Sequence, residues 1–158
     1  MYVGRDSIID ESCEIADDVW IGNWVHIRYG AKIGSKSELR DHVFLGPEVT
    51  IGKNSRIYQF CNIGMGTTIG DDCFIAVGTY TADDKALTWP EKDYENYREY
   101  GYEKRPPVIE DKVRVGMGVR ILPGVILREG CRIGMGAVVT KSTEPWKTYA
   151  GVPAREMK

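Results

Sequence analysis

Residues 15–39 read IADDVWIGNWVHIRYGAKIGSKSEL, with a branched aliphatic residue at every sixth position. The period continues in both directions without a miss, over Val3, Ile9, Ile15, Ile21, Ile27, Ile33, Leu39, Leu45, Ile51, Ile57, Ile63, Ile69 and Ile75. Amphipathic helices place apolar residues three and four positions apart, and half-buried strands alternate them, so a period of six favours neither. It is typical of a parallel β-helix, in which short strands and turns alternate and successive coils stack.

The period returns in a different phase near the end of the chain, at Ile109, Val115, Ile121, Leu127, Ile133 and Val139. Glycines recur directly after the aliphatic residue and again two places later, which suits corners that need unusual backbone angles or close approach. Three six-residue units would close one triangular coil. Thirteen units followed by six therefore predict an all-β prism of about six coils.

The period is interrupted between Thr81 and Ile109. This segment, 82–108, contains Trp89 and four tyrosines, two of which share a face of a short helix predicted over 93–99. Long loops in compact folds are usually functional or disordered, and the aromatic content argues against disorder. The segment is therefore either a wall or lid over a site, or an excursion packed on the prism. We expect one domain, 1–158, with first coils at 3–81, an inserted loop at 82–108, later coils at 109–144 and a tail at 145–158.

Composition excludes several classes of protein. The 158 residues carry 21 Lys and Arg against 23 Asp and Glu, for a net charge of −2, so a nucleic-acid partner is not expected. No apolar run has the length of a membrane span, and the N-terminus lacks the core of a signal peptide. We therefore expect no membrane partner and a cytoplasmic location.

The four cysteines share one place in the unit, four positions after the aliphatic residue, where small residues otherwise stand. We predict that Cys13, Cys61, Cys73 and Cys131 point inward as small hydrophobes and have no redox or metal role. A dense set of aromatic residues is expected on the outside of the prism, which favours burial in a homo-oligomer. These residues are Trp20, Trp24, Tyr29, Phe44, Tyr58 and Phe60.

Several segments together carry a resemblance to a known family. They are WIGNWVHIRYGAKIG at 20–34, HVFLGP at 42–47, YTAD at 80–83, RPPV at 105–108, ILPGV at 121–125, GMGAVVTK at 134–141 and GVPAR at 151–155. In this order they resemble the left-handed β-helix, hexapeptide-repeat acyltransferases, most closely the N-acetyltransferases that act on nucleotide-linked amino sugars. The GMGAVVTK and GVPAR segments are more specific for a CoA-dependent transferase than the hexads are.

The resemblance implies a left-handed parallel β-helix that forms a homotrimer, with an active site in each groove between subunits. It implies transfer of acetyl from acetyl-CoA to a nucleotide-sugar amine for surface-polysaccharide synthesis, with no metal. The corners at Gly116, Gly118, Gly134 and Gly136 would approach the pantetheine amides of CoA. Lys141 and Arg155 would contact its phosphates, unless they are ordinary solvated charges.

Acyl transfer to an amine needs a neutral amine, donors for the oxyanion and a route for the departing proton. Asp83 stands where the related enzymes carry Asn in a Phe-Thr-Asn turn, so it could orient the amine or accept its proton; Asn could only orient it. Asp84 is the second candidate. The chain has two histidines, His26 and His42, which are predicted to face outward near one corner and could act as the base. Otherwise the CoA thiolate could accept the proton.

Three other functions are known or conceivable for a hexapeptide repeat. A γ-type carbonic anhydrase shares the hexads but binds zinc through three histidines. This chain has two histidines, so that function is excluded. A purely structural β-helix would give no reason for the aromatic loop or the tail. An O-acetyltransferase of the same fold, acting on a sugar hydroxyl, remains an alternative and would depend on a histidine base.

Overall fold

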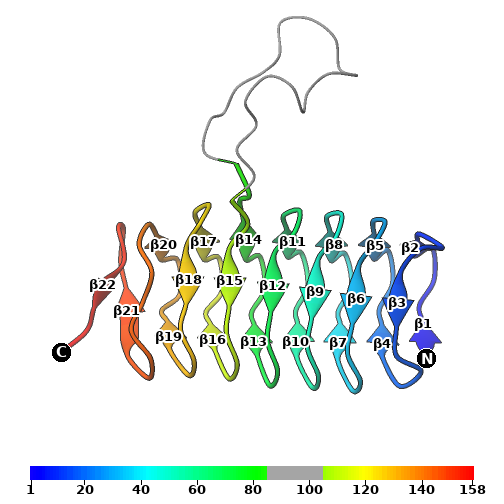
Figure 1. Ribbon diagram of the computed structural model, residues 1–158, viewed down its shortest axis with the longest axis horizontal. Helices are drawn as coiled ribbons and strands as arrows, with labels where there is room; N and C mark the ends of the chain where they lie inside the picture. The colour runs from blue at the N-terminus through cyan, green and yellow to red at the C-terminus, as the bar shows by residue number, and fades with distance from the viewer. Residues whose placement is uncertain (85–104) are drawn as a thin grey trace, which may run out of the picture.

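The structure is a computed structural model that describes residues 1–84 and 105–158 (Figure 1). The helix predicted over 93–99, together with Trp89 and the tyrosines of the insertion, lies outside the described residues. Short strands and turns make up the described chain. None of its elements is a helix long and apolar enough to cross a membrane.

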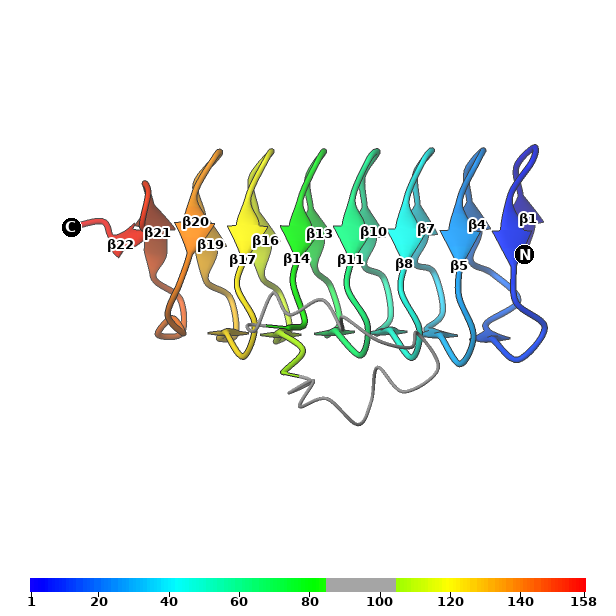
Figure 2. The ribbon, with the colours of Figure 1, turned by 90° about the horizontal axis from the view of Figure 1, so that it is seen from above.

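The strands form three parallel sheets, here named A, B and C, that make the sides of a prism (Figures 1 and 2). Sheet A contains β1 (Tyr2–Val3), β4 (Trp20–Ile21), β7 (Glu38–Leu39), β10 (Arg56–Ile57), β13 (Phe74–Ile75), β16 (Arg114–Val115), β19 (Arg132–Ile133), β21 (Thr148–Ala150) and β22 (Arg155–Glu156). Sheet B contains β2 (Ile8–Ile9), β5 (His26–Ile27), β8 (Phe44–Leu45), β11 (Asn62–Ile63), β14 (Tyr80–Thr81), β17 (Arg120–Ile121) and β20 (Val138–Val139). Sheet C contains β3 (Glu14–Ile15), β6 (Lys32–Ile33), β9 (Thr50–Ile51), β12 (Thr68–Ile69), β15 (Val108–Ile109) and β18 (Ile126–Leu127).

Consecutive strands pass from sheet A to B to C and then begin the next coil, so the predicted all-β parallel β-helix is confirmed. The arrangement is consistent with the left-handed form. The predicted count of about six coils was slightly low, because the prism has about seven. One six-residue unit was missing from the predicted count because Thr81 stands where the other units have an aliphatic residue. Thr81 lies in β14, between β11 and β17, and is 7% exposed. Threonine fills the strand because it is β-branched, and its hydroxyl accepts a hydrogen bond of 2.8 Å from the Gly64 N–H.

The interior consists of aliphatic ladders. Ile21, Leu39 and Ile57, for example, stack in sheet A and are fully buried, and each such side chain contributes about 1.5–3 kcal/mol through burial. Smaller residues fill the second inward place of each unit. Cys61, Cys73 and Cys131 are buried and Cys13 partly so, and all four are free thiols, as predicted for small inward residues. Burial raises the pKa of the Cys61 and Cys73 thiols to about 11.

The final segment closes the end of the prism. β21 pairs with β19 in parallel and with β22 in antiparallel fashion. The turn between β21 and β22 lies against β20. The Ala154 N–H donates to the Val138 carbonyl at 2.8 Å, and the Val138 N–H donates to the Gly151 carbonyl at 3.1 Å. These bonds occupy backbone groups that would otherwise form an open sheet edge.

Candidate active site

The insertion begins and ends at the corner between sheets B and C. The Arg105 N–H donates to the Asp83 carbonyl at 2.8 Å, and the Gly124 N–H donates to the Arg105 carbonyl at 2.7 Å. The half-buried side chain of Asp83 reaches back over the preceding coil. A Cβ placed on Gly64 would lie 3.0 Å from the Asp83 Oδ1 atom, so this glycine leaves room for the carboxylate. Asp83 is thus held at a defined place, and half-buried Asp84 follows it.

His42 lies at the corner between sheets A and B, within a stack of three rings. Its imidazole lies 4.9 Å from the Trp24 ring centroid and 4.9 Å from that of Phe60, with interplanar angles of 10° and 7°. All three residues have a positive φ, between 53° and 60°, which is uncommon for large side chains. His26 points outward from β5 and meets Phe44 edge to face at 5.5 Å. Both histidines therefore face outward near one corner, as predicted.

The four candidate catalytic residues do not come together within one protomer. Asp83 and Asp84 follow β14, whereas His26 lies in β5 and His42 just before β8. In sheet B, β14 is three strands from β5 and two from β8, or about 14 and 10 Å at the usual strand spacing. Asp83 also lies at the B–C corner and His42 at the A–B corner. A site that uses both pairs would need a second copy of the chain.

The four candidate CoA-binding glycines lie at the A–B corner of the last coils but differ in their surroundings. Gly118 and Gly136 have a φ of +70° and open space around them. Gly116 and Gly134 are packed, because an added Cβ would lie 2.7 Å from Met135 N and 2.9 Å from Ala150 Cβ, respectively. All four N–H groups already donate to carbonyls of neighbouring coils. A ligand at this corner would therefore meet carbonyl oxygens, which accept hydrogen bonds from amide N–H groups.

Lys141 and Arg155 line one hollow of about 240 Å³ at the C-terminal end of the prism, next to Tyr149 and Glu156. The β21–β22 hairpin brings Arg155 to Lys141, which follows β20. Two cations in one hollow suit a phosphorylated ligand. Among the residues described, no group of three or more His, Cys, Asp or Glu could hold a metal ion.

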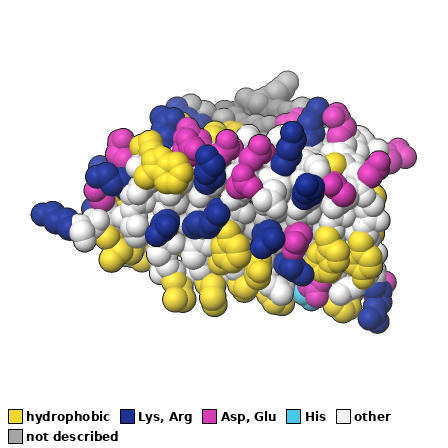
Figure 3. Space-filling view, turned by 90° about the horizontal axis from the view of Figure 1, so that it is seen from below, with side chains coloured by type: hydrophobic (Ala, Val, Ile, Leu, Met, Phe, Trp, Pro, Cys, Tyr) yellow, Lys and Arg dark blue, Asp and Glu magenta, His cyan; other side chains and the backbone are white. Residues whose placement is uncertain are grey.

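From the sequence we predicted Trp24 and Phe60 only as exposed aromatic residues, and their stack with His42 was not predicted. Their positions, 24, 42 and 60, are one coil apart and could have shown it. Trp24 is 45% and Phe60 56% exposed. The later coils add exposed Met117 and Met135 near the same corner. Figure 3 shows hydrophobic side chains gathered along this long edge of the molecule.

Two stretches match known repeat families. Residues 43–80 match the hexapeptide repeat of succinyl-transferase, and residues 106–141 match the bacterial transferase hexapeptide (six repeats). An acyl-(acyl-carrier-protein)–UDP-N-acetylglucosamine O-acyltransferase of Saccharophagus degradans is 38% identical over 66 residues, 42% of this chain and 26% of that protein. The serine acetyltransferase of Bacillus subtilis is 29% identical over 142 residues, 87% of this chain and 61% of that protein. The chain thus spans less than two thirds of the length of these relatives.

Solved structures share the fold. A putative acetyltransferase from Bacillus cereus superposes with a TM-score of 0.74 at 19% identity, over 98% of this chain and 83% of that one. A variant of AntD, an N-acyltransferase from the same organism in complex with dTDP and coenzyme A, gives a TM-score of 0.51 at 21% identity, over 99% and 83% of the two chains. The predicted resemblance to hexapeptide-repeat acyltransferases is therefore confirmed, and the chain carries their repeat on both sides of the insertion.

Proposed function

We propose that this protein is an acetyl-CoA-dependent N-acetyltransferase that acts on the amine of a nucleotide-linked amino sugar, as a cytoplasmic homotrimer in surface-polysaccharide synthesis. The observation that carries acyl-CoA use is the arrangement of the last coil. An open glycine corner at Gly136 and the cationic hollow of Lys141 and Arg155 lie at opposite ends of β20. Gly136 and Lys141 are five residue steps apart, or about 16 Å in extended chain. A pantetheine arm could cover this distance with its phosphates at the cations.

In this proposal the amine nitrogen attacks the thioester carbonyl, the C–S bond breaks and CoA leaves as the thiolate. The nitrogen must lose a proton, which passes to a side chain or to the departing sulfur. Asp83 orients the amine or accepts its proton, and Asp84 is the second candidate. His26 or His42 would reach the groove from the neighbouring subunit, because the two pairs lie apart within one protomer. AntD, with its N-acyltransferase activity and bound dTDP, supports the choice of acceptor.

The experiment is a thermal-shift series with acetyl-CoA, followed by UDP- and dTDP-linked amino sugars. Ligand binding raises the apparent unfolding temperature by mass action, so both ligands should shift it. Lys141→Gln and Arg155→Gln should reduce the shift by acetyl-CoA and leave that by the sugar nucleotide. If no CoA ester shifts the unfolding temperature of the intact chain, the proposed function is wrong.

A second candidate is O-acetylation of a sugar hydroxyl. The name of one relative favours it, since that protein is an O-acyltransferase that acts on UDP-N-acetylglucosamine. A hydroxyl needs a general base in the transition state, so His26→Ala or His42→Ala should abolish turnover. The N-acetyltransferase proposal instead predicts that Asp83→Ala, which removes both the orienting group and the base, lowers turnover with an amino-sugar acceptor more than either change of histidine does.

A further inference from the structure

The outer face of sheet A carries a row of three arginines and one phenylalanine that the proposed function does not use. Arg56, Phe74, Arg114 and Arg132 point outward from β10, β13, β16 and β19, and each lies directly opposite the next in register. At the usual strand spacing the row extends about 14 Å along the prism. Figure 3, which views the molecule from this side, shows Lys and Arg side chains following one another along the middle of the face.

The charge on this row is poorly compensated. The Arg56 Nε atom lies 3.6 Å from Glu38, but Arg40 holds the same carboxylate more closely, at 2.5 Å. Arg114 donates to the backbone carbonyls of Asp72 and Val113. Within residues 1–84 and 105–158, neither Arg114 nor Arg132 forms an ion pair with a carboxylate. Like charges directly opposite across neighbouring strands destabilise a sheet, so this pair is unfavourable unless an anion binds to it.

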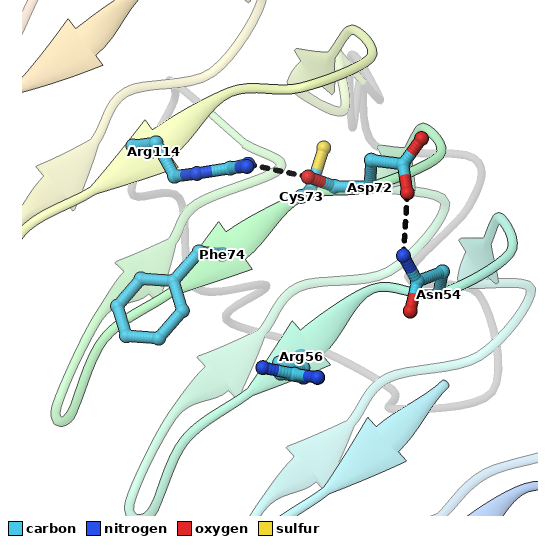
Figure 4. A pocket seen from close by; sticks show the side chains of 6 residues that line it. All are labelled: Asn54, Arg56, Asp72, Cys73, Phe74 and Arg114. Carbon is cyan, nitrogen blue, oxygen red and sulfur yellow. Dashed lines mark hydrogen bonds between the residues drawn. The ribbon is translucent and has the colours of Figure 1, made fainter. Parts of the chain in front are cut away.

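An aromatic ring lies within the row, beside a hollow. The hollow measures about 220 Å³ and is lined by Asn54, Arg56, Asp72, Cys73, Phe74 and Arg114 (Figure 4). The Asp72 carboxylate accepts a 2.6 Å hydrogen bond from Asn54, whereas Arg114 reaches the backbone carbonyl of Asp72 (Figure 4). Phe74 packs against Tyr58 at 4.9 Å between ring centroids and is only half-buried. Guanidinium groups and part of an aromatic ring are thus available to one ligand.

We propose that this face of sheet A binds a nucleoside diphosphate. Arg114 and Arg132 would hold the two phosphates, because guanidinium groups bind phosphate oxygens in a bidentate manner and neighbouring strands match the span of a diphosphate. Phe74 would stack on the base, since base–aromatic stacking tolerates any base. We propose a nucleotide and not a simple anion, because a simple anion would need only one arginine and no aromatic ring. A nucleoside diphosphate is present both in coenzyme A, as its ADP part, and in a sugar nucleotide.

The test is calorimetric titration of the full chain with ADP, dTDP, inorganic diphosphate and coenzyme A. Arg114→Gln and Arg132→Gln should each weaken nucleotide binding about tenfold, because each removes a charge-assisted hydrogen bond. Phe74→Leu should weaken ADP and dTDP but not diphosphate. Arg28→Gln, at an exposed arginine on another corner, is the matched control and should bind as the wild type does. Within the described chain the Arg132 side chain makes no hydrogen bond or ion pair, and the backbone hydrogen bond from the Arg132 N–H to the Lys147 carbonyl is kept in Arg132→Gln. This variant therefore tests binding without disturbing the coil.

The identity of the ligand follows from which titration responds. Loss of coenzyme A binding in Arg132→Gln assigns the face to the cofactor and replaces Lys141 and Arg155 as the place of its diphosphate. Loss of dTDP binding alone assigns the face to the acceptor. Equal affinities in wild type and in both arginine variants would overturn the proposal, as would ADP binding that is no tighter than that of diphosphate and is unchanged by Phe74→Leu. Since binding is measured without turnover, such a failure would leave the acetyltransferase proposal standing. That proposal fails instead if wild-type protein does not bind acetyl-CoA.

Discussion

Replacing Gly64 by alanine tests whether the coil beneath the insertion positions Asp83. The added Cβ would lie 2.8 Å from the Thr81 carbonyl oxygen and 3.0 Å from Asp83 Oδ1, so the strand end and the carboxylate must both move. Overpacking of this kind costs about 1–3 kcal/mol of stability. If Asp83 orients the amine, a displacement of several tenths of an ångström should lower turnover by about tenfold or more.

Gly34→Ala is the matched control for this change. Gly34 occupies the same place in its unit, and its Cβ would meet the Gly52 backbone at 2.7 Å, so a similar loss of stability is expected. It lies at the corner between sheets C and A, away from Asp83. Urea unfolding of both variants, together with steady-state acetyl transfer, separates the two effects. Equal turnover in the two variants would refute the argument that Gly64 acts through Asp83.

Three further predictions concern the scaffold. Leu45→Ala should lower the free energy of unfolding by about 2–5 kcal/mol in urea titrations, because Leu45 is fully buried and leaves a cavity. Cys61 should resist Ellman's reagent at pH 8 until the protein unfolds, since burial raises its pKa to about 11; rapid reaction of the folded protein would contradict this. Hydrogen bonds from the Ser35 hydroxyl and the Lys36 N–H lower the pKa of Asp18 in the folded protein. The contribution of Asp18 to stability is therefore present above the ordinary carboxyl pKa and is lost as the pH falls through the lowered pKa. The thermal unfolding temperature of Asp18→Asn should consequently fall less steeply with acid pH than that of the wild type.

Much of the scaffold could be predicted from the sequence because one physical requirement repeats. Every coil must fill the same interior, so the branched aliphatic residue returns in step and the small inward place accepts cysteine. Before the insertion, the predicted ladder missed one strand, where a polar residue met the same requirement. Thr81 continues the ladder because its hydroxyl is hydrogen-bonded to Gly64 and its branched Cβ fits a strand.

The surface was harder to predict, because it depends on which residues meet across coils. Trp24, His42 and Phe60 adopt positive φ values that local propensity assigns to glycine or asparagine, and the stack is apparent only once the coils are in register. The row from Phe74 to Arg114 is interrupted in the sequence by the insertion, which conceals the repeat. Likewise, the separation of the histidines from Asp83 required the strand order of sheet B.

In the proposed reaction, this prism transfers an acetyl group from acetyl-CoA to an amino-sugar nucleotide. The most direct measurement mixes the full chain with acetyl-CoA and UDP- or dTDP-linked amino sugars, and follows both the release of the CoA thiol and the product mass. We expect thiol release that depends on the acceptor, with a product heavier by one acetyl group on nitrogen. Absence of thiol release with every such acceptor, in protein whose unfolding temperature acetyl-CoA does not raise, would contradict it.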